Sequence, residues 1–500
     1  MMQIQQKSLS KQKTMKCSIG IVLLLTAFLS TSCVTPDLSG GDDLKPSTKP
    51  ITVETARQND ETAQIGAAQH PRILETYGGE YRDAKMERMV AKIVGRLTAV
   101  SENPNQTYQI TILNSPNVNA FALPGGYLYI TRGLLALAND SAEVAAVIAH
   151  EMAHVTSNHG ILRLQKEQEV KLSQNVVSDV LSNNQSKAQE AALKGQLRLA
   201  QFSRNQEIQA DVIGIKMLGL AGYNPFSSPK FLESMEAYTG FRDVSGATDP
   251  SLDFLASHPA TPQRIQLAVS EARKVGAPGV GATDRDAFLD GIDGMIYGDT
   301  AEEGYVRDNS FIHTKLGVTF AVPTGFTLDN SSEAVVATGP FDTAIRFDVA
   351  TLPKGMSAVD YLRSGWVAGL KNDTVRAIKI DGMQAARAYA ANEKWQFDVI
   401  VIADGNRIYR FLIAAPHGST QLNNIADATV LSFKKLSGSQ IRAIKPLRIH
   451  VVTVKPGETV SSLSNQMSGA NNREKLFRII NGMQPGDIVA AGQRVKIISE

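Results

Sequence analysis

The spacing of apolar and polar residues changes along the 500-residue chain. From Ile65 to about Val275 the spacing is mainly helical, apart from one patch rich in β-branched and aromatic residues, TYQITILNSPNVNAFALPGGYLYI, at 107–130. In this patch Pro124-Gly125-Gly126 separates two apolar runs, which predicts a hairpin. Residues 163–200 contain no proline and predict a long helix with a break near 182–184. The pattern therefore predicts a mainly helical domain with a small sheet.

Residues 309–437 have a different character. GVTFAVPTGF and TAIRFDVATL read as strands, and WQFDVIVIA and RIYRFLIAA flank Asp404-Gly405-Asn406, which predicts an antiparallel hairpin. Helical patterns near 357–370 and 420–432 complete an α+β domain. It contains no constellation with an evident chemistry, so a binding or scaffolding role is the default expectation.

The first residues predict a targeting segment. A lysine-bearing stretch leads into the apolar run Ile19–Leu29, which is too short to span a bilayer comfortably and is typical of a signal-peptide core, with Met15 as a second candidate start. Small residues precede Cys33, which resembles a bacterial lipoprotein processing site, although Ser30 stands where leucine is usual. Ordinary signal cleavage and an uncleaved anchor are the alternatives. We expect a lipid anchor at Cys33.

Composition and charge narrow the class of protein. The chain is 43% hydrophobic and 20% charged, as in soluble globular proteins. Its only cysteines are Cys17 and Cys33, so no disulfide framework is expected. The formal charge is +2, but the four lysines of the first 32 residues account for it. Nothing in this balance predicts a nucleic-acid partner.

The strongest candidate for a catalytic metal site is His150-Glu151-Met152-Ala153-His154. It lies in a helix that we expect to be capped by Ser141. Residues i and i+4 lie on one helix face, so both imidazoles can reach one zinc ion while Glu151 reaches a water on that metal. Two histidines and a glutamate in an otherwise apolar helix are costly to bury without a partner such as a metal. The alternative is that backbone carbonyls satisfy both histidines.

A third ligand is needed for a catalytic zinc site. Ser157 and Gly160 occupy the positions where a metzincin has glycine and histidine, which excludes that class. His159 is rotated off the shared helix face and is expected either behind the ligands or at the surface. Glu207 and Asp211 are again i and i+4: Glu207 could complete a His/His/Glu site with one open position, and Asp211 could accept the spare N–H of a ligating histidine. The alternative for this pair is a solvated helix face shared with Arg204.

These motifs together resemble metallopeptidase family 48, the zinc gluzincin group of HtpX and BepA-like peptidases. The resemblance covers about residues 65–275 and is carried by HEMAH, VTSNHG, SRNQEIQAD, NAFALPGGYLYITRGLL and SHPATPQRI. It implies one Zn²⁺ per chain on His150, His154 and Glu207, with Glu151 as general base and Asp211 as an auxiliary active-site acid. The transmembrane segments of some members and the tetratricopeptide tail of others are missing here, so substrate choice does not follow from either branch.

Two further features would complete such a site. The segment Asn119 to Leu123 could present a strand edge to which an extended substrate adds, unless this strand is only core. His258, in Ser257-His258-Pro259 upstream of Arg264, lies in a loop that resembles one found near the active site of relatives. His258 could be an inhibitory fourth ligand, a hydrogen-bond donor to the transition state, or a structural turn residue.

Residues 451–498 resemble a LysM domain with the order strand, two short helices, strand. The likeness rests on Val452-Thr453-Val454, Gly457-Glu458-Thr459, Leu463, Asn481 and the run 492–497. It implies contact with peptidoglycan. The usual tyrosine of the first strand is absent and the segment SGANNRE between the helices is polar, so a purely stabilising module is the alternative.

The sequence therefore predicts an α+β, multidomain zinc endopeptidase of the bacterial cell envelope that faces the periplasm, with the outer membrane favoured. Its expected substrates are unfolded or extended proteins, in particular misfolded or misassembled envelope proteins. The alternatives are an autoinhibited chaperone or scaffold and a peptidoglycan-peptide hydrolase. The expected parts are a signal peptide (1–32), a tether (33–62), a mainly helical gluzincin-type domain (63–275), a connector (276–308), an α+β domain (309–437), a basic linker (438–448) and a βααβ LysM-like domain (449–500).

Overall fold

The computed structural model describes residues 60–500 apart from 124, 164, 169–184, 246–253, 332–333 and 470–471. The predicted signal peptide, Cys33, all but the end of the predicted tether, and the predicted helix break at 182–184 lie outside the described residues. Among the described helices, none has the length and apolarity needed to cross a membrane. The described chain mixes helices with several separate sheets, which confirms the α+β, multidomain class.

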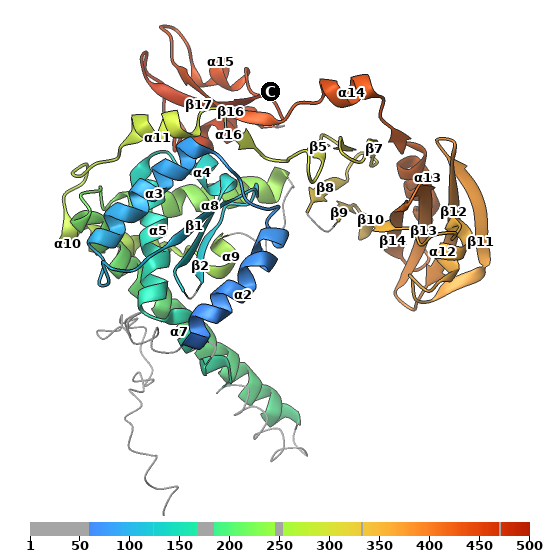
Figure 1. The fold of residues 1–500 in the computed structure, drawn as a ribbon, viewed down its shortest axis with the longest axis horizontal. Coiled ribbons are helices and arrows are strands. Elements are labelled where there is room, and N and C mark those ends of the chain that lie inside the picture. The colour runs from blue at the N-terminus through green and yellow to red at the C-terminus, as the bar shows by residue number, and fades with distance from the viewer. Residues whose placement is uncertain are drawn as a thin grey trace, which may run out of the picture. The chain divides into compact units, whose positions relative to one another are not determined.

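The first part of the described chain is mainly helical (Figure 1). Its elements are α2 (Asp60–Thr76), α3 (Ala84–Ala99), β1 (Gln109–Leu113), β2 (Ala120–Leu123), β3 (Tyr127–Thr131), α4 (Arg132–Leu137), α5 (Ser141–Thr156), α7 (Gln185–Leu220), α8 (Ser227–Ser245), α9 (Phe254–Ser257), α10 (Pro262–Val275) and α11 (Arg285–Ile292). The small sheet has the order β1-β3-β2, with β1 parallel to β3 and β2 antiparallel to it. This confirms the predicted hairpin at Pro124-Gly125-Gly126.

Helix α5 lies in the centre of this region and is buried along almost its whole length. Its alanine-rich sequence allows close approach from several sides, and α3, α7, α8 and strand β2 all pack against it. The N-cap is Asp140, whose side chain accepts the backbone N–H of Glu143. The expectation of Ser141 as N-cap is wrong by one residue, because Asp140 has the extended backbone that a cap requires and Ser141 is already helical.

The middle part of the chain contains a seven-stranded antiparallel sheet with the order β11-β12-β13-β14-β10-β9-β8, and a four-stranded sheet β15-β7-β6-β5. The strands are β5 (Tyr305–Arg307), β6 (Ser310–His313), β7 (Val318–Ala321), β8 (Thr327–Asn330), β9 (Val335–Gly339), β10 (Thr343–Thr351), β11 (Leu370–Ile380), β12 (Met383–Ala391), β13 (Trp395–Asp404), β14 (Arg407–Pro416) and β15 (Lys434–Lys435). The β13–β14 pair confirms the predicted hairpin.

Two helices and two apolar cores accompany the large sheet. Helix α12 (Ala358–Arg363) belongs to a core with Val399 and Val401, whereas α13 (Leu422–Leu431) belongs to a core with Ile400 and Ile402. Because successive side chains of a strand point to opposite faces, the two helices cover opposite faces of the sheet. The helix expected over 357–370 is shorter than predicted, since β11 begins at Leu370.

The last part contains α14 (Gly438–Ala443), β16 (Leu447–Thr453), α15 (Val460–Ser464), α16 (Arg473–Ile480) and β17 (Arg494–Ser499). The order from β16 to β17 is the expected strand, two helices, strand, and a LysM identity stays a prediction. Strand β4 (Ile296–Tyr297), from the predicted connector, adds to the other edge of β16. The buried side chains of these elements form one continuous core with those of α3, α5 and α8.

Lys496 of β17 is fully buried at this junction. Its Nζ donates to the carbonyl oxygens of Ala136, Leu137 and Ala138 at 2.8, 3.3 and 2.5 Å. These carbonyls are at the C-terminal end of α4, two residues before the cap of α5. The last strand of the chain is therefore joined to the segment from which the histidine helix starts.

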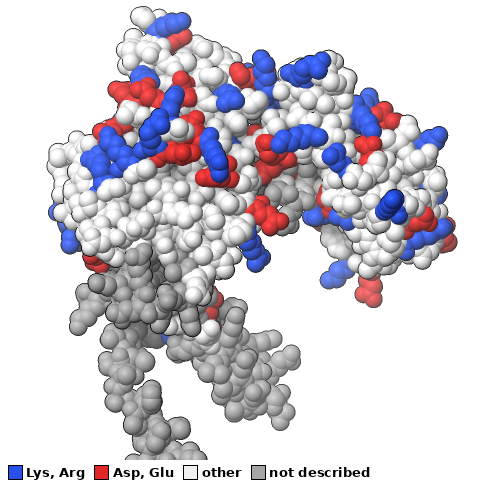
Figure 2. Space-filling model, in the orientation of Figure 1, with Lys and Arg blue, Asp and Glu red and all other residues white. Residues whose placement is uncertain are grey.

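Charges are mixed on the face of the molecule that Figure 2 shows, where blue Lys and Arg side chains alternate with red Asp and Glu side chains. Several of the acidic and basic side chains form ion pairs, for example Arg494 with Asp286 and Asp290. This face therefore resembles an ordinary solvated surface with interspersed signs.

Candidate metal centre

Helix α5 places His150 and His154 on one face, as their spacing predicts. Their Nε2 atoms lie 3.0 Å apart and both face the carboxylate of Glu207, from which each is 3.4 Å distant. Their ring nitrogens thus face carboxylates and other imidazoles, so the alternative of two histidines satisfied by backbone carbonyls is wrong.

Glu207 reaches the site because α7 packs closely against α5. At the crossing is Gly214, and a Cβ built there would lie 3.1 Å from the backbone nitrogen of His150. A larger residue would hold the two helices apart. Glu207 and Asp211 are both buried, while Arg204 is exposed, so the pair does not form a solvated face with Arg204 as the alternative required.

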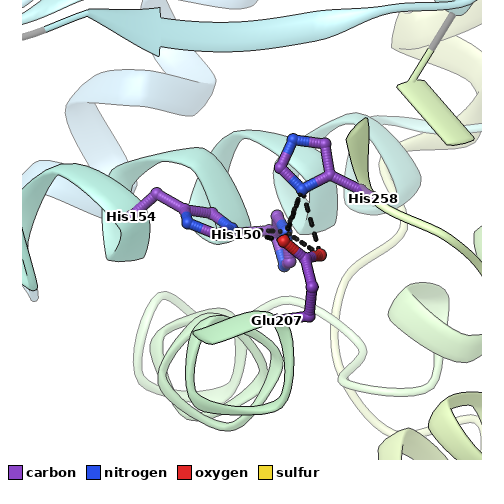
Figure 3. Close-up of side chains that lie close together, drawn as sticks. All are labelled: His150, His154, Glu207 and His258. Carbon is purple, nitrogen blue, oxygen red and sulfur yellow. Dashed lines mark hydrogen bonds and ion pairs between the residues drawn. The ribbon is translucent and has the colours of Figure 1, made fainter. Parts of the chain in front are cut away.

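A fourth group joins the three predicted ligands (Figure 3). His258, directly after the short helix α9, places its Nδ1 2.9 Å from Glu207 Oε1 and 3.4 Å from His150 Nε2. Its ring stacks on Phe254, with ring centroids 4.4 Å apart. One ligand atom from each of the four residues lies within 4.8 Å of the others.

The spacing of these atoms fits a zinc ion. Zinc binds histidine nitrogen and carboxylate oxygen at about 2.0–2.2 Å, and the corners of such a tetrahedron are about 3.4 Å apart. The separations among His150, His154 and Glu207 are 3.0–3.4 Å, and those from His258 to Glu207 and His150 are 2.9 and 3.4 Å. Four nitrogen and oxygen donors therefore lie close enough together to surround one zinc ion.

Asp211 lies behind the ligands and orients one of them. Its Oδ1 is 2.9 Å from His150 Nδ1, the ring nitrogen that points away from the ligand cluster. Arg264 holds the same carboxylate with two N–H groups, at 2.6 and 2.9 Å, and places a third nitrogen 2.9 Å from Glu207. Arg264 also donates to the carbonyl of His258 at 3.1 Å, which fixes the loop that carries that ligand.

His159 is buried beside the site. Of the two positions expected for it, the one at the surface is therefore wrong. Its Nδ1 lies 2.9 Å from His154 Nδ1. Helix α5 ends at Thr156, and Asn158 takes a left-handed backbone with φ of 52°, which turns the chain back over the helix end. Helical spacing continued past Thr156 could not place His159, because the helix does not continue there.

Residues 82–272 match the model of peptidase family M48. This part of the chain is similar to the peptidases of family M48, and we refer to residues 82–272 as the M48 domain. It contains all four clustered ligand residues, together with Glu151, Asp211 and Arg264.

Several curated proteins resemble the M48 domain. A mitochondrial metalloendopeptidase OMA1 of Arabidopsis thaliana is 33% identical over 169 residues, which cover 34% of this chain and 32% of that protein. A beta-barrel assembly-enhancing protease of Yersinia pestis is 27% identical over 262 residues, covering 51% of this chain and 52% of that protein. The corresponding Escherichia coli K12 protease is 26% identical over 216 residues, covering 41% and 43%. The chain thus spans between about a third and a half of the length of these relatives.

Glu151 is a buried carboxylate that lies beside the cluster. Its Oε1 is buried and accepts no hydrogen bond among the described residues, and the nearest ionisable nitrogen is His258 Nε2 at 3.6 Å. Burial raises the pKa of Glu151 above its usual value, with the nearby histidines opposing that rise. The carboxylate borders a small, mainly apolar cavity of about 10 Å³ that also touches Ala120 of β2 and Tyr129.

The carboxylates and histidines of the site shift one another's pKa values. Burial opposes a charge on His150, but hydrogen bonds to Asp211 and Glu207 outweigh it and raise its pKa to about 9. Burial likewise opposes the charge on Glu207, yet His258 and His150 hold its pKa well below the usual range. Burial lowers the pKa of His154 well below its usual value. An anionic glutamate between imidazoles is the charge pattern that a divalent cation stabilises.

Sequence reasoning placed five residues that the structure brings together: His150, Glu151, His154, Glu207 and Asp211. It did not identify the roles of Gly214 and Arg264. A single glycine within a strong helical pattern was the available signal for Gly214, because such a glycine often marks a close approach. Arg264 carried no such signal, since its carboxylate partners, Asp211 and Glu207, lie more than fifty residues away in the sequence.

Proposed function

We propose that the chain is a zinc-dependent endopeptidase of the bacterial cell envelope that cleaves misfolded or misassembled envelope proteins. The observation that carries this proposal is the His150, His154 and Glu207 cluster, with donor separations that fit zinc and a buried carboxylate next to it, Glu151, whose Oε1 accepts no hydrogen bond among the described residues. The match of residues 82–272 to the model of peptidase family M48 supports the same chemistry.

The chemical roles follow from the positions of the side chains. When bound, zinc would lower the pKa of a water toward neutrality and polarise the scissile carbonyl. Glu151 Oε1 accepts the proton of the attacking water and returns it to the leaving amine nitrogen. Burial raises the pKa of Glu151, which favours uptake of a proton by this carboxylate. Asp211 keeps the proton of His150 on Nδ1, so that Nε2 stays free for the metal.

Strand β2 is the proposed docking edge for substrate. It is the terminal strand of its sheet, so the edge away from β3 carries no other strand of that sheet. Helix α5 packs against β2, and Ala120 shares the small cavity with Glu151. An extended peptide added to this edge would run past the ligands and bond through its backbone. Backbone docking tolerates many sequences, which suits unfolded substrates.

In the structure His258 lies where it would close the candidate metal site to water and substrate. It is the fourth donor of the cluster, so we propose that it occupies the position that water and substrate need, and that it leaves before cleavage. This arrangement is also the observation that favours a second candidate function, an autoinhibited chaperone or scaffold with little proteolysis. The two candidates differ in whether His258 can be displaced by an unfolded protein.

The cellular setting is proposed from the sequence and the relatives. The bacterial relatives are named for β-barrel assembly, which supports a substrate in the envelope. A lipid anchor at Cys33 would hold the chain at a membrane facing the periplasm, with the outer membrane favoured. Residues 449–500 would add contact with peptidoglycan, and retention on purified sacculi tests that contact. Release of muropeptides from sacculi would instead support the alternative of a peptidoglycan-peptide hydrolase.

Metal removal tests the proposal. Purified chain treated with a zinc chelator should lose cleavage of unfolded casein, and addition of one equivalent of Zn²⁺ should restore it. Cleavage that persists after the metal is gone would overturn the proposal. A chain that holds zinc but cleaves neither casein nor unfolded envelope proteins, even when His258 is replaced, would support the chaperone candidate.

A further inference from the structure

His159 is a buried polar group that contacts His154 from outside the ligand cluster, as Asp211 contacts His150. It is 3% exposed, and its Nδ1 lies 2.9 Å from Nδ1 of His154. The two rings meet edge to face, with centroids 4.8 Å apart and an interplanar angle of 77°. His154 therefore has the cluster on one side of its ring and a second imidazole on the other.

The positions of the protons follow from this arrangement. Nε2 of His154 faces Glu207 and His150 and must present a lone pair to a metal, so the ring proton of neutral His154 is on Nδ1. That N–H can be accepted by Nδ1 of His159, which must then be unprotonated. The proton of His159 is consequently on Nε2, where Oε1 of Gln209 lies 3.3 Å away as an acceptor. Along this series of hydrogen bonds, from His154 through His159 to Gln209, each group thus has the donor or acceptor that its neighbour needs.

Helix α7 holds His159 in this orientation at two points. Gln209 contacts the ring, and Nε2 of Gln206 donates to the backbone carbonyl of His159 at 3.0 Å. Both glutamines are buried, and they flank Glu207 in the sequence. The turn of α7 that supplies the third ligand therefore also positions the support of the second.

We propose that His159 is a positioning residue for His154, which it keeps in the Nδ1–H tautomer with Nε2 turned toward the zinc. This inference rests on the proposed zinc site. The two histidine ligands would then differ in their support. His150 donates to the carboxylate of Asp211, whereas His154 donates to a neutral imidazole, which makes the weaker hydrogen bond.

The variants follow from the proposed contacts. His159→Leu removes the acceptor at similar volume. His159→Asn keeps an oxygen acceptor near the position of Nδ1, and Gln209→Leu removes the group that orients the ring while leaving His159 in place. His313→Leu is a matched control, because His313 is another largely buried histidine whose Nδ1 accepts a hydrogen bond, from Leu316 N at 3.3 Å, but it is in the strand-rich middle of the chain.

The readouts are zinc affinity of the full chain, measured by competition with a chromogenic chelator, and the visible absorption bands of the Co²⁺-substituted chain, which report ligand geometry. Loss of a group behind a ligating histidine weakens metal binding by about 10- to 100-fold. His159→Leu should fall in that range and shift the cobalt bands. His159→Asn should recover most of the affinity, Gln209→Leu should lose several-fold, and the His313→Leu control should match the wild type.

The outcomes separate this inference from the proposed function. A wild-type chain that binds no stoichiometric zinc would overturn the proposed function itself. A wild-type chain with tight zinc, together with wild-type affinity and cobalt spectrum in His159→Leu, would overturn the positioning role alone. If His159→Leu does not fold, the zinc affinities of Gln209→Leu and His159→Asn decide. Weaker zinc binding by Gln209→Leu with near-normal binding by His159→Asn supports the positioning role. Equal zinc affinity in these two variants refutes it.

Discussion

His150 donates through Nδ1 to Asp211, at a separation of 2.9 Å, and Arg264 donates to both oxygens of the same carboxylate. Burial alone would raise the pKa of Asp211, but Arg264 and His150 together outweigh burial and lower it. Asp211 is therefore an anion that fixes one ring and is itself fixed by one arginine.

Replacing this anion should weaken the metal site without removing a ligand. We expect Asp211→Asn to bind zinc about 10- to 100-fold more weakly, because a neutral amide makes a weaker bond to His150 and leaves Arg264 without its charge partner. Competition with a chelator measures this. Asp398→Asn is the matched control, since Asp398 is a buried partner of Arg387 in the large sheet. Equal zinc affinity in the two variants would contradict the role of Asp211.

His258 should restrain cleavage. Because His258 is the fourth donor of the cluster, His258→Ala should open that position and raise the initial rate of casein cleavage several-fold while zinc remains bound. The measurement is cleavage rate per bound zinc. A fall in rate would instead assign His258 to catalysis, and an unchanged rate would leave it as a residue of the turn.

Close packing of α7 on α5 should depend on Gly214. Gly214→Val places side-chain atoms against the backbone of His150, so we expect a loss of about 1–3 kcal/mol in stability together with weaker zinc binding. Gly95→Ala in α3 is the control, because a Cβ there meets nothing within 4 Å and should add about 0.5–1 kcal/mol. Thermal unfolding and zinc content of both variants test this pair. A Gly214→Val chain as stable as the wild type would refute it.

Lys496 should make the stability of the junction between β17 and the end of α4 depend on pH. Burial lowers its pKa to about 7, and the charged groups that act on it are Glu143, Asp140, Arg285 and Lys230. The unfolded chain, with an ordinary lysine pKa, binds the proton up to about pH 10.4. Between these pKa values the folded chain holds fewer protons, so this residue's contribution to stability is smallest below pH 7 and rises with pH.

Lys496→Met isolates that contribution. The advantage of the wild type over the variant should grow between pH 7 and pH 9, at up to about 1.4 kcal/mol per pH unit. Amide hydrogen exchange in β16 and β17, compared between the two chains at each pH, measures the difference with intrinsic exchange rates cancelled. A difference that stays constant with pH would contradict the assignment.

The parts of the site that sequence reasoning located are those set by local periodicity. His150 with His154, and Glu207 with Asp211, each lie four residues apart on one helix, so their shared faces follow from helix geometry. His159 could not be placed, because the chain leaves the helix at Ser157 and turns at Asn158.

In the fold, too, the features set by residues adjacent in the sequence were predictable, and those set by distant residues were not. Hairpins with strong turn residues, such as Asp404-Gly405-Asn406, were predicted, since the turn and both strands are adjacent in the sequence. The burial of Lys496 against α4 was not predicted, because its carbonyl partners lie about 360 residues earlier in the chain. A lysine in an alternating strand otherwise indicates a solvent-facing position.

The central claim is that Glu151 is the general base of a zinc endopeptidase, and Glu151→Gln tests it most directly. The variant keeps the shape of the side chain and all four clustered ligands, so zinc content should remain at one per chain. Casein cleavage per bound zinc should fall by at least about 100-fold, because no group remains to take the proton of the water. Cleavage at the wild-type rate by zinc-loaded Glu151→Gln would contradict the account.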